Sequence, residues 1–509
     1  MPAKVVVIGF DAAEATLVEP WARDGCLPAF GRLTEEGTLL RPETNVDTLP
    51  ASIWAEIATG RLGGKIGWYW NRYQMHSGET VSRQTRAEDV DLTAVWDLAS
   101  RAGRRCAVLD VPHAAPAAGL NGIQLREWGN HDTAFDFGTE PPEFMDEVLE
   151  RFGRYPGPRG DDCEEHETDA DLERILDGIE QGVERKRELF RTVLEEGEWD
   201  LFFACFSESH CVSHQYWQYF DTTSPWHQPN APERFKRAIP TVYRRLDAAL
   251  EELLEAAGAD ATIIAVLSHG MGQSVGGPQV LPEVLVRLGY GSGHGVTSTV
   301  RGRMPPVVKR ALKSVLRGGA RNRLQRAAGS LPRPLESPQT RAIRVHNGRC
   351  GAIRLNVKGR EPFGAVEPGA EYDAVCAELI EEIGKLENAD TGAPAVREVV
   401  RTDAVYGPDR HPNIPDLVVR FDGSSGPIHA VRSARIGTIA TPIEQHSLQR
   451  SGDHTPHSRI WVRGPGIAAG EARDEGRSID IAPTVLLLLG VSVPTSLDGR
   501  PLELVRAAV

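Results

Sequence analysis

The chain has 509 residues, of which 40% are hydrophobic and 25% are charged, and its formal net charge is −14. This length allows one large α/β domain with an elaboration or two to four ordinary domains, and the negative balance argues against general nucleic-acid binding. The apolar run near the start is too short for a signal peptide or a membrane span. Seven cysteines without paired spacing predict no disulfide framework, so we expect a protein of the reducing cytoplasm.

Four apolar runs predict strands that are buried on both faces of a largely parallel sheet. They are VVVIGF (5–10), CAVLDV (106–111), DLFFACF (200–206) and ATIIAVLS (261–268). Patterns typical of helices alternate with them, for example at 170–197 and 239–258. The alternation favours an open doubly wound sheet, in which functional sites gather beyond the carboxyl ends of the strands.

Polar residues stand where such a site is expected. Asp11 follows the first run, Glu208 and His210 follow the third, and His269 follows the fourth. A single acid after a strand is usually a cap or turn residue. Three such positions along the chain are harder to explain in this way and indicate a site.

The segment SESHCVSHQYW (207–217) carries a metal-ligand pattern. If it is helical, His210 and His214 lie one turn apart on the same face and can bind one ion; the alternative is a surface pair near a tryptophan. His454 in SGDHTPHSRIWVRGPGI (451–467) offers a third imidazole. Three histidines and a water form a catalytic zinc arrangement.

These segments resemble the alkaline phosphatase superfamily, and specifically its type I phosphodiesterase and nucleotide pyrophosphatase branch. The resemblance follows the family's order along the chain. It rests on VVVIGFDA, TLPASIWAEIATGR, DLFFACFSESHCVSHQYW, VLSHGMG, AIRLNVKGREPFG, IPDLVV, GDHTPHSRIWVRGPGI and SIDIAPTVLLLLGVSVPTSLDGRPL. It implies a three-layer α/β/α sandwich around a largely parallel sheet, with an inserted cap.

The resemblance also implies a metal-dependent hydrolase of phosphate esters that acts through a hydroxyl nucleophile. Residue by residue, it assigns the nucleophile to Thr48 and the metal ligands to Asp11, Thr48, His210, His214, His269 and His454. A threonine hydroxyl is a poor nucleophile unless a cation favours the alkoxide. Zn²⁺ is the expected cofactor, as one or two ions, although Mn²⁺ or Fe also accepts imidazole.

Two hydroxyl groups compete for the nucleophile position. In relatives the nucleophile often stands two residues closer to the Thr59-Gly60 dipeptide than Thr48 does, and that spacing falls on Pro50, which has no hydroxyl. Thr48 keeps the T-x-P form and is the first choice, with Ser52 as the other candidate. A threonine at such a place also commonly caps a helix.

The metal ligands depart from the family pattern at two carboxylates. Relatives carry aspartate where this chain has His210 and Ser268, so Asp11 alone would face two divalent cations. Either one metal is lost, or nearby acids such as Glu208 and Asp453 are recruited. We expect one tightly held ion at the three histidines and a weaker or absent second ion.

Basic residues provide candidates for substrate binding. Lys65 and Arg72 follow the nucleophile segment, and the aromatic run at 68–70 is expected to pack in the core or to stack on a base. The segment 301–344 has twelve basic residues against one acid. It could cover the active site, bind an acidic membrane or partner, or be a solvated insertion.

We therefore predict a catalytic core of residues 1–285 and 400–509 and an inserted cap of residues 286–399. The leading hypothesis is a phosphodiesterase or nucleotide pyrophosphatase with a small phosphate-ester substrate, for which a nucleotide is one candidate. A phosphomonoesterase or phosphomutase on the same scaffold is the alternative. From another class, the chain could be a pseudoenzyme that keeps one metal and binds an anionic ligand or partner, since two carboxylates are missing.

Overall fold

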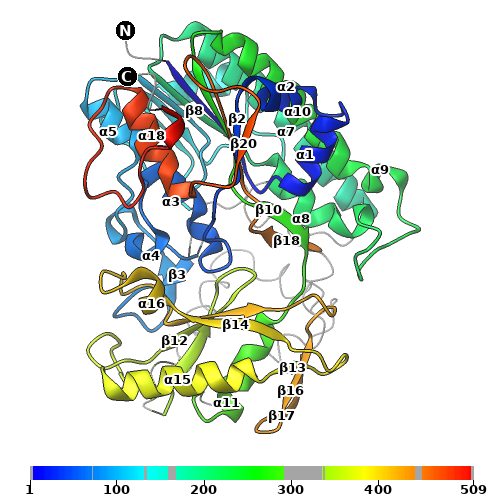
Figure 1. Ribbon diagram of the computed structural model, residues 1–509, viewed down its shortest axis with the longest axis vertical. Helices are drawn as coiled ribbons and strands as arrows, with labels where there is room; N and C mark the ends of the chain where they lie inside the picture. Colours follow the sequence, from blue (N-terminus) through cyan, green and yellow to red (C-terminus); the bar gives the residue numbers. More distant parts are fainter. Residues whose placement is uncertain are drawn as a thin grey trace, which may run out of the picture.

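The computed structural model describes residues 4–70, 73–130, 134–158, 168–291, 335, 337, 339–441 and 450–505. The described chain forms two lobes, which lie one above the other in Figure 1. The larger lobe is built on a nine-stranded sheet, and the smaller lobe on a four-stranded sheet. Among the described residues, no helix is both long enough and apolar enough to cross a membrane.

The nine-stranded sheet has the order β20-β2-β19-β9-β1-β8-β5-β6-β7. Its strands are β1 (Val5–Phe10), β2 (Thr38–Leu40), β5 (Cys106–Leu109), β6 (Gly122–Arg126), β7 (Gly138–Glu140), β8 (Leu201–Phe206), β9 (Thr262–Leu267), β19 (Arg459–Arg463) and β20 (Glu471–Arg473). The central pairs β9-β1, β1-β8, β8-β5 and β5-β6 are parallel, whereas β19 and β7 join antiparallel. The prediction of a largely parallel sheet is confirmed.

Strand β1 shows why the predicted runs lack polar residues. Val6 and Ile8 face one hydrophobic core, while Val5 and Val7 face a second core on the other side of the sheet. All four side chains are fully buried. Since successive side chains point to opposite faces, a strand covered on both faces is apolar throughout.

Helices cover both faces and complete the predicted three layers (Figure 1). One face carries α1 (Ala15–Arg23), α2 (Pro28–Glu36), α6 (Phe144–Arg151), α7 (Asp169–Glu196), α8 (Glu208–Phe220), α9 (Glu233–Lys236) and α10 (Ala238–Ala257). The other face carries α3 (Ile53–Thr59), α5 (Val95–Arg101) and α18 (Ile481–Leu488). The short helix α4 (Gly63–Ile66) and the hairpin of β3 (Tyr73–Met75) and β4 (Ser82–Gln84) follow α3 toward the smaller lobe.

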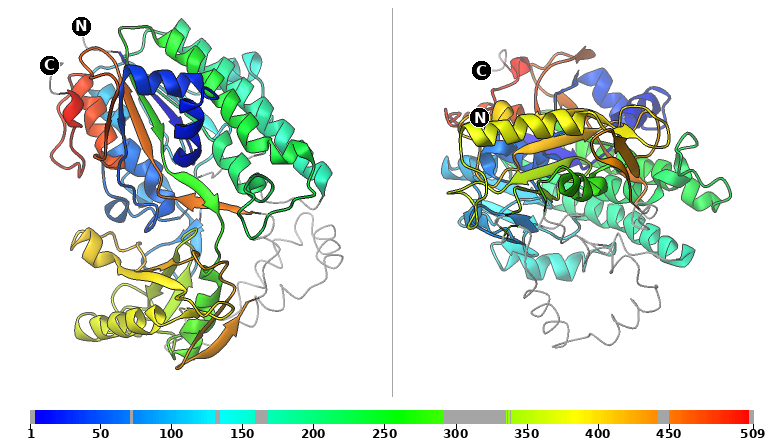
Figure 2. Two further views of the ribbon diagram at one scale, coloured as in Figure 1. Left: turned by 45° about the vertical axis from the view of Figure 1, so that its right-hand side comes forward. Right: turned by 90° about the horizontal axis from the view of Figure 1, so that it is seen from below.

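The smaller lobe is an antiparallel sheet of order β11-β12-β15-β14, with two of its three described helices packed on one face. Its elements are β11 (Ala342–Val345), β12 (Gly351–Leu355), β14 (Val396–Arg401), β15 (Leu417–Phe421), α11 (Leu281–Arg287), α15 (Ala370–Gly384) and α16 (Thr402–Tyr406). A small sheet of β13 (Glu387–Asn388), β16 (Ala430–Ser433) and β17 (Gly437–Ala440) lies beside it. Figures 1 and 2 show α15 along the side of this lobe away from the larger one.

The end of the insertion was predicted too early. Strands β15, β16 and β17 follow position 400 but belong to the smaller lobe, and the chain rejoins the nine-stranded sheet only at β19. The apolar run of β15 suits either sheet, and only its pairing with β12 and β14 decides between them. Most of the basic segment 301–344 lies outside the described residues.

A two-stranded ribbon of β10 (Gly270–Gln273) and β18 (Gly452–Thr455) stands at the junction of the lobes. Here β10 follows β9 on the way into the smaller lobe, and β18 precedes β19 on the way back. The ribbon therefore places residues from two distant parts of the sequence next to the carboxyl ends of β1, β8 and β9.

Candidate metal centre and cleft

The predicted metal-binding residues other than Thr48 meet at the edge of three adjacent parallel strands. Phe10 of β1 lies opposite Phe206 of β8 and Leu267 of β9, so the three strands end at the same level. Asp11 and His269 follow two of these ends. The expectation that polar residues after the strands lie together is met because parallel strands bring their carboxyl ends to one edge.

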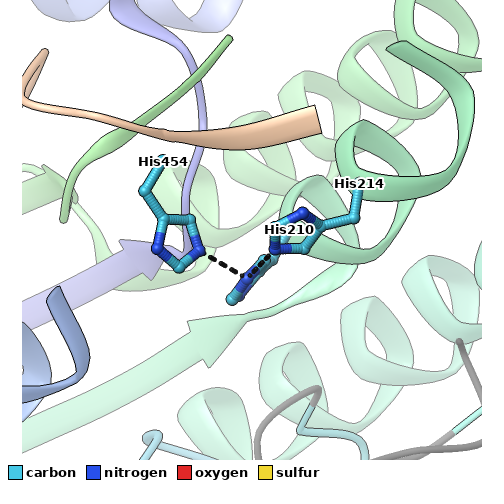
Figure 3. A group of neighbouring side chains, drawn as sticks. All are labelled: His210, His214 and His454. Carbon is cyan, nitrogen blue, oxygen red and sulfur yellow. Dashed lines mark hydrogen bonds between the residues drawn. The ribbon is translucent and has the colours of Figure 1, made fainter. Parts of the chain in front are cut away.

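Helix α8 begins at Glu208, directly after β8, and so carries two histidines toward this edge. The Nε2 atoms of His210 and His214 are 2.8 Å apart, and Nε2 of His454, from β18, is 3.0 Å from that of His210. Figure 3 shows the three imidazoles pointing toward one another. All three side chains are buried, and their ligand atoms lie within 4.8 Å of one another.

Hydrogen bonds on the far side of two imidazoles fix their orientation. Nδ1 of His210 lies 2.7 Å from Oδ2 of Asp11, and Nδ1 of His214 lies 2.7 Å from the carbonyl oxygen of Gly452. With a proton on each Nδ1, both Nε2 atoms keep a lone pair that can bind a metal. Arg450 also contacts His214, with its Nε 3.0 Å from Nδ1 and its Nη2 2.5 Å from Nε2, so this guanidinium must shift for a cation to reach that nitrogen. Such carboxylate and carbonyl partners are the usual second layer around metal-binding histidines.

The cluster fits a single divalent cation. Burial, followed by the charges of His269 and His210, holds the pKa of His454 well below its usual range, so this imidazole is neutral as a ligand must be. Zinc binds imidazole nitrogen at about 2.0–2.1 Å in a tetrahedral arrangement, which needs nitrogens slightly farther apart than the observed 2.8 and 3.0 Å. A small outward movement of the rings would accommodate the ion.

Asp11 holds His210 rather than facing the centre of the cluster. Its Oδ2 contacts His210, and its Oδ1 accepts hydrogen bonds from Trp54 Nε1 at 2.7 Å and Ser268 Oγ at 3.2 Å. Burial raises the pKa of Asp11, but the charge and hydrogen bond of His210 outweigh it and hold the pKa well below its usual range. Both oxygens are engaged by protein donors, which favours an orienting role over the predicted role of metal ligand.

His269 lies beside the cluster without joining it. Its Nδ1 is 3.0 Å from Ser268 Oγ, and its ring centroid is 4.5 Å from that of His454. Among the described residues, His269 lines the same cleft as His210 and His454. It is therefore placed to exchange a proton with a ligand in that cleft.

The structure places Thr48 away from this cleft. Its hydroxyl oxygen accepts a hydrogen bond from Arg420 Nη2 at 2.7 Å, and its carbonyl oxygen accepts one from Asn347 Nδ2 at 2.7 Å. Both donors belong to the smaller lobe. Pro50 and Ala51 line the cleft instead, and no side chain caps the helical turn that begins at Pro50. Thr48 thus joins the two lobes.

The second hydroxyl candidate is also turned inward. Ser52 is fully buried, and its Oγ donates to the carbonyl oxygen of Leu49 at 2.8 Å. Neither Thr48 nor Ser52 is among the described residues that line the cleft. The role of Thr48 as nucleophile stays a prediction, and the direction of its hydroxyl argues against it.

Lys65 and Glu208, which were predicted to bind substrate and to be recruited as a ligand, also lie outside the cleft. Lys65 Nζ pairs with Asp498 Oδ1 at 2.6 Å and does not line the cleft, while Arg72 lies outside the described residues. Glu208 points into the core, where its Oε1 accepts a hydrogen bond from Tyr155 at 2.8 Å. Of the acids considered for recruitment, only Asp453 lines the cleft.

The cleft has a volume of about 490 Å³ and lies between the lobes, a size typical of a small-molecule site. Of its basic residues, sequence analysis named Arg344 only within the segment 301–344 and did not single out His346, Arg349 or Arg450. Arg450 lies closest to the metal cluster, with its Nη2 2.5 Å from Nε2 of His214. No local motif marks these residues, because the smaller lobe and the ribbon bring them to the cleft only in the folded chain.

Comparison with known proteins agrees with this architecture. The structure is similar to that of phosphonoacetate hydrolase from Sinorhizobium meliloti 1021. The superposition covers 96% of each chain, with a TM-score of 0.53 and 14% sequence identity. For human ectonucleotide pyrophosphatase / phosphodiesterase 5 the coverage is 97% of both chains, with a TM-score of 0.50 and 12% identity. The chain thus shares the fold of these two proteins, an alkaline-phosphatase-like α/β fold as predicted.

The family follows from the sequence match. The model of the type I phosphodiesterase / nucleotide pyrophosphatase family matches residues 5–434, and the chain belongs to that family. A curated relative, the 2,3-bisphosphoglycerate-independent phosphoglycerate mutase of Rhodopirellula baltica (strain DSM 10527 / NCIMB 13988 / SH1), is 32% identical over 112 residues. That match spans 21% of this chain and only 18% of the mutase.

Proposed function

We propose that the protein is a metal-dependent phosphoester hydrolase whose single divalent cation is held by His210, His214 and His454. The convergence of three buried imidazole nitrogens at the edge of the cleft carries this proposal. Zinc is the first choice, and manganese or iron is compatible with the same ligands. Among the residues that the structure describes, no comparable ligand set is present for a second ion, and the oxygens of Asp11 are engaged by Trp54, Ser268 and His210.

The remaining residues support hydrolysis of an anionic ester. When bound, the cation would supply Lewis acidity to a phosphoryl oxygen and lower the pKa of a water molecule. Arg450, beside His214, can donate charge-assisted hydrogen bonds to another phosphoryl oxygen. His269 lies in the cleft and can accept the proton of the attacking group and return it to the leaving oxygen.

If Thr48 is the nucleophile, as the sequence predicts, its hydroxyl must break the hydrogen bond with Arg420 and turn toward the cleft. Attack by water on phosphorus needs no such movement. In that reaction the water oxygen forms the new bond to phosphorus, the bond to the leaving oxygen breaks with its electron pair, and His269 carries the proton between them. We propose this single displacement over a covalent intermediate.

Membership of the family favours a diester or nucleotide substrate. The local match to a mutase supports the alternative of a phosphomonoesterase or phosphomutase. The absence of the two family carboxylates at His210 and Ser268 keeps the pseudoenzyme alternative open, with one ion and an anionic ligand.

The test combines metal content with turnover. Wild type, His214→Ala and the control His429→Ala are analysed for bound zinc, manganese and iron, and assayed with bis-p-nitrophenyl phosphate and p-nitrophenyl phosphate. His429 belongs to the smaller lobe and pairs with Asp390. We expect one ion per chain in wild type and in the control, and no bound ion in His214→Ala. Wild type and the control should be active, and His214→Ala should be inactive.

Other outcomes separate the alternatives. One ion without turnover of either ester would support the pseudoenzyme. Turnover that survives loss of the ion would exclude the proposed metal dependence. The ratio of the two activities decides between diesterase and monoesterase.

A further inference from the structure

The smaller lobe contributes a positively charged wall to the cleft. Arg344 of β11 and Arg349, in the loop before β12, both line the cavity that contains His210 and His269. The loop approaches the larger lobe closely at Gly348, which has φ +58° and where a Cβ atom would meet Pro50 Cγ at 3.1 Å. Glycine permits both the backbone conformation and the close approach, so the loop is held over the cleft.

The charges of the cleft exceed what one phosphoryl group balances. Among the described lining residues, three arginines (Arg344, Arg349 and Arg450) stand against two carboxylates (Asp11 and Asp453). A divalent cation at the three histidines adds two positive charges, whereas a phosphodiester carries one negative charge and a monoester at most two. The remaining positive charge in a partly desolvated cleft is costly unless the substrate brings a second anionic group.

Two acids lie near Arg349 and only partly balance its charge: Asp453, which also interacts with Arg450 and is one of the two carboxylates counted above, and Asp47. The Oδ1 atom of Asp47 is 3.9 Å from Arg349 Nε. Asp47 pairs more closely with Arg397, at 2.7 Å. Its charge is thus shared between two guanidinium groups, and Arg349 can bind a further anion.

A flat aromatic surface lies beside the arginines. The rings of Trp70 and His346 stack with centroids 5.7 Å apart and an interplanar angle of 23°, and both line the cleft. This surface suits the organic part of a substrate that extends from the metal cluster toward the smaller lobe.

We propose that Arg344 and Arg349 form a subsite for a second anionic group, a carboxylate or a phosphate, on the part of the substrate distal to the reacting phosphorus. The proposal rests on the proposed function, because it places the reacting phosphoryl group at the three histidines. It defines the substrate class as bis-anionic phosphoesters. Planar guanidinium groups bind carboxylate and phosphate alike through paired hydrogen bonds, so the two sources share one chemistry.

Binding of non-hydrolysable ligands tests the subsite independently of turnover. The probes are butylphosphonate, 4-phosphonobutyrate and butane-1,4-bisphosphonate, which share a phosphonate and a flexible chain and differ in the distal group. Dissociation constants are measured calorimetrically on the zinc-loaded full chain. The proteins are wild type, the double variant Arg344→Gln/Arg349→Gln, and the control Arg435→Gln, whose arginine pairs with Glu378 in the smaller lobe.

We expect wild type and the control to bind at least one doubly anionic probe about tenfold more tightly than butylphosphonate, the scale of a charge-assisted contact. This preference should fall to about one in the double variant. If 4-phosphonobutyrate binds more tightly than butane-1,4-bisphosphonate, the distal group of the substrate is a carboxylate. The opposite order identifies a phosphate. Because the ratio is taken within one protein, a general loss of stability does not imitate the result.

Two results would overturn the subsite: equal affinity of wild type for all three probes, or an unchanged preference in the double variant. Failure of the proposed function looks different, since the probes would then bind selectively while the protein hydrolyses neither nitrophenyl ester.

Discussion

At the residue scale, the roles of two predicted side chains depend on what already contacts them. Asp11 stands where a metal ligand was predicted, yet its oxygens accept hydrogen bonds from Trp54 and Ser268 and contact His210. The hydroxyl of Thr48 is occupied in the same way by Arg420. A sequence motif identifies a residue type at a position, whereas the direction of its side chain depends on partners that are distant in the sequence.

Thr48→Val tests whether this hydroxyl reacts or only joins the lobes. We expect hydrolysis to be retained without a pre-steady-state burst, and the free energy of unfolding to fall by about 1.5–3 kcal/mol, the value of a hydrogen bond to a charged group. Rapid-quench kinetics and urea unfolding measure the two effects. Loss of about a thousandfold or more in kcat at unchanged stability would instead identify Thr48 as the nucleophile.

At the element scale, the site depends on the contact between helix α8 and strand β18. Gly452 lies so close to α8 that a Cβ atom would be 2.2 Å from the carbonyl oxygen of Ser213 and 3.1 Å from Cα of His214. The carbonyl oxygen of Gly452 also orients His214. The small residue therefore sets the distance between His454 and the two histidines of the helix.

Gly452→Ala should separate α8 from β18 and weaken the metal centre. We expect a loss of about 1–3 kcal/mol of stability from overpacking and a fall in zinc affinity of about tenfold or more from the disturbed second layer. Gly384→Ala, at the end of α15 where an added Cβ meets no atom within 4 Å, is the control. Competition with a chromophoric chelator measures the affinity, and equal zinc affinity in both variants would contradict this account.

The ends of the strands show a related feature of backbone geometry. Ala12, Asp110 and Glu127 follow β1, β5 and β6 and have φ values of 51°, 54° and 56°. Non-glycine residues in this region are strained, and such strain concentrates at functional edges. The chain thus turns sharply where each of these strands meets the cleft side of the sheet.

At the scale of the whole molecule, the smaller lobe is stabilised by a buried ionic cluster. Asp416 is fully buried, and its two oxygens are each 2.7 Å from a different guanidinium nitrogen of Arg360. Arg410 and the hydroxyl of Tyr372 lie within 3.3 and 3.0 Å. Burial raises the pKa of Asp416, but Arg360 and Arg410 outweigh it and hold the pKa well below its usual range.

This cluster predicts acid sensitivity. A carboxyl group whose pKa is depressed in the folded state contributes stability in full above its unfolded-state pKa, about 3.9 for aspartate, and loses it as the pH falls from there through the folded-state pKa. Asp416→Asn, which leaves Arg360 partly unpaired in a buried site, should cost about 3–5 kcal/mol near neutral pH.

Urea unfolding at a series of pH values measures this contribution. The difference between wild type and Asp416→Asn should narrow as the pH falls below about 4. Asp474→Asn, at an exposed pair with Arg41, is the control and should stay near wild type throughout. A difference that is independent of pH would rule out linkage to Asp416.

The sequence by itself determined the core of this protein. Continuous apolar runs are a local signal of strands buried on both faces, and they predicted β1, β5, β8 and β9. Helical periodicity is a local signal of one buried face, and it predicted α7 and α10. The pairing of His210 with His214 was predictable for the same reason, since both lie on one helix. The order of family segments gave the superfamily.

Only the tertiary structure decided the assignments that depend on distant partners. Strand β15 pairs within the smaller lobe, Asp11 orients His210, Thr48 binds Arg420, and Arg344 and Arg349 reach the cleft. Each of these contacts joins segments separated by tens to hundreds of residues. Local periodicity and spacing carry no information about such contacts, because they form only when distant segments pack together, within one lobe for β15 and Asp11 and between the lobes for Thr48.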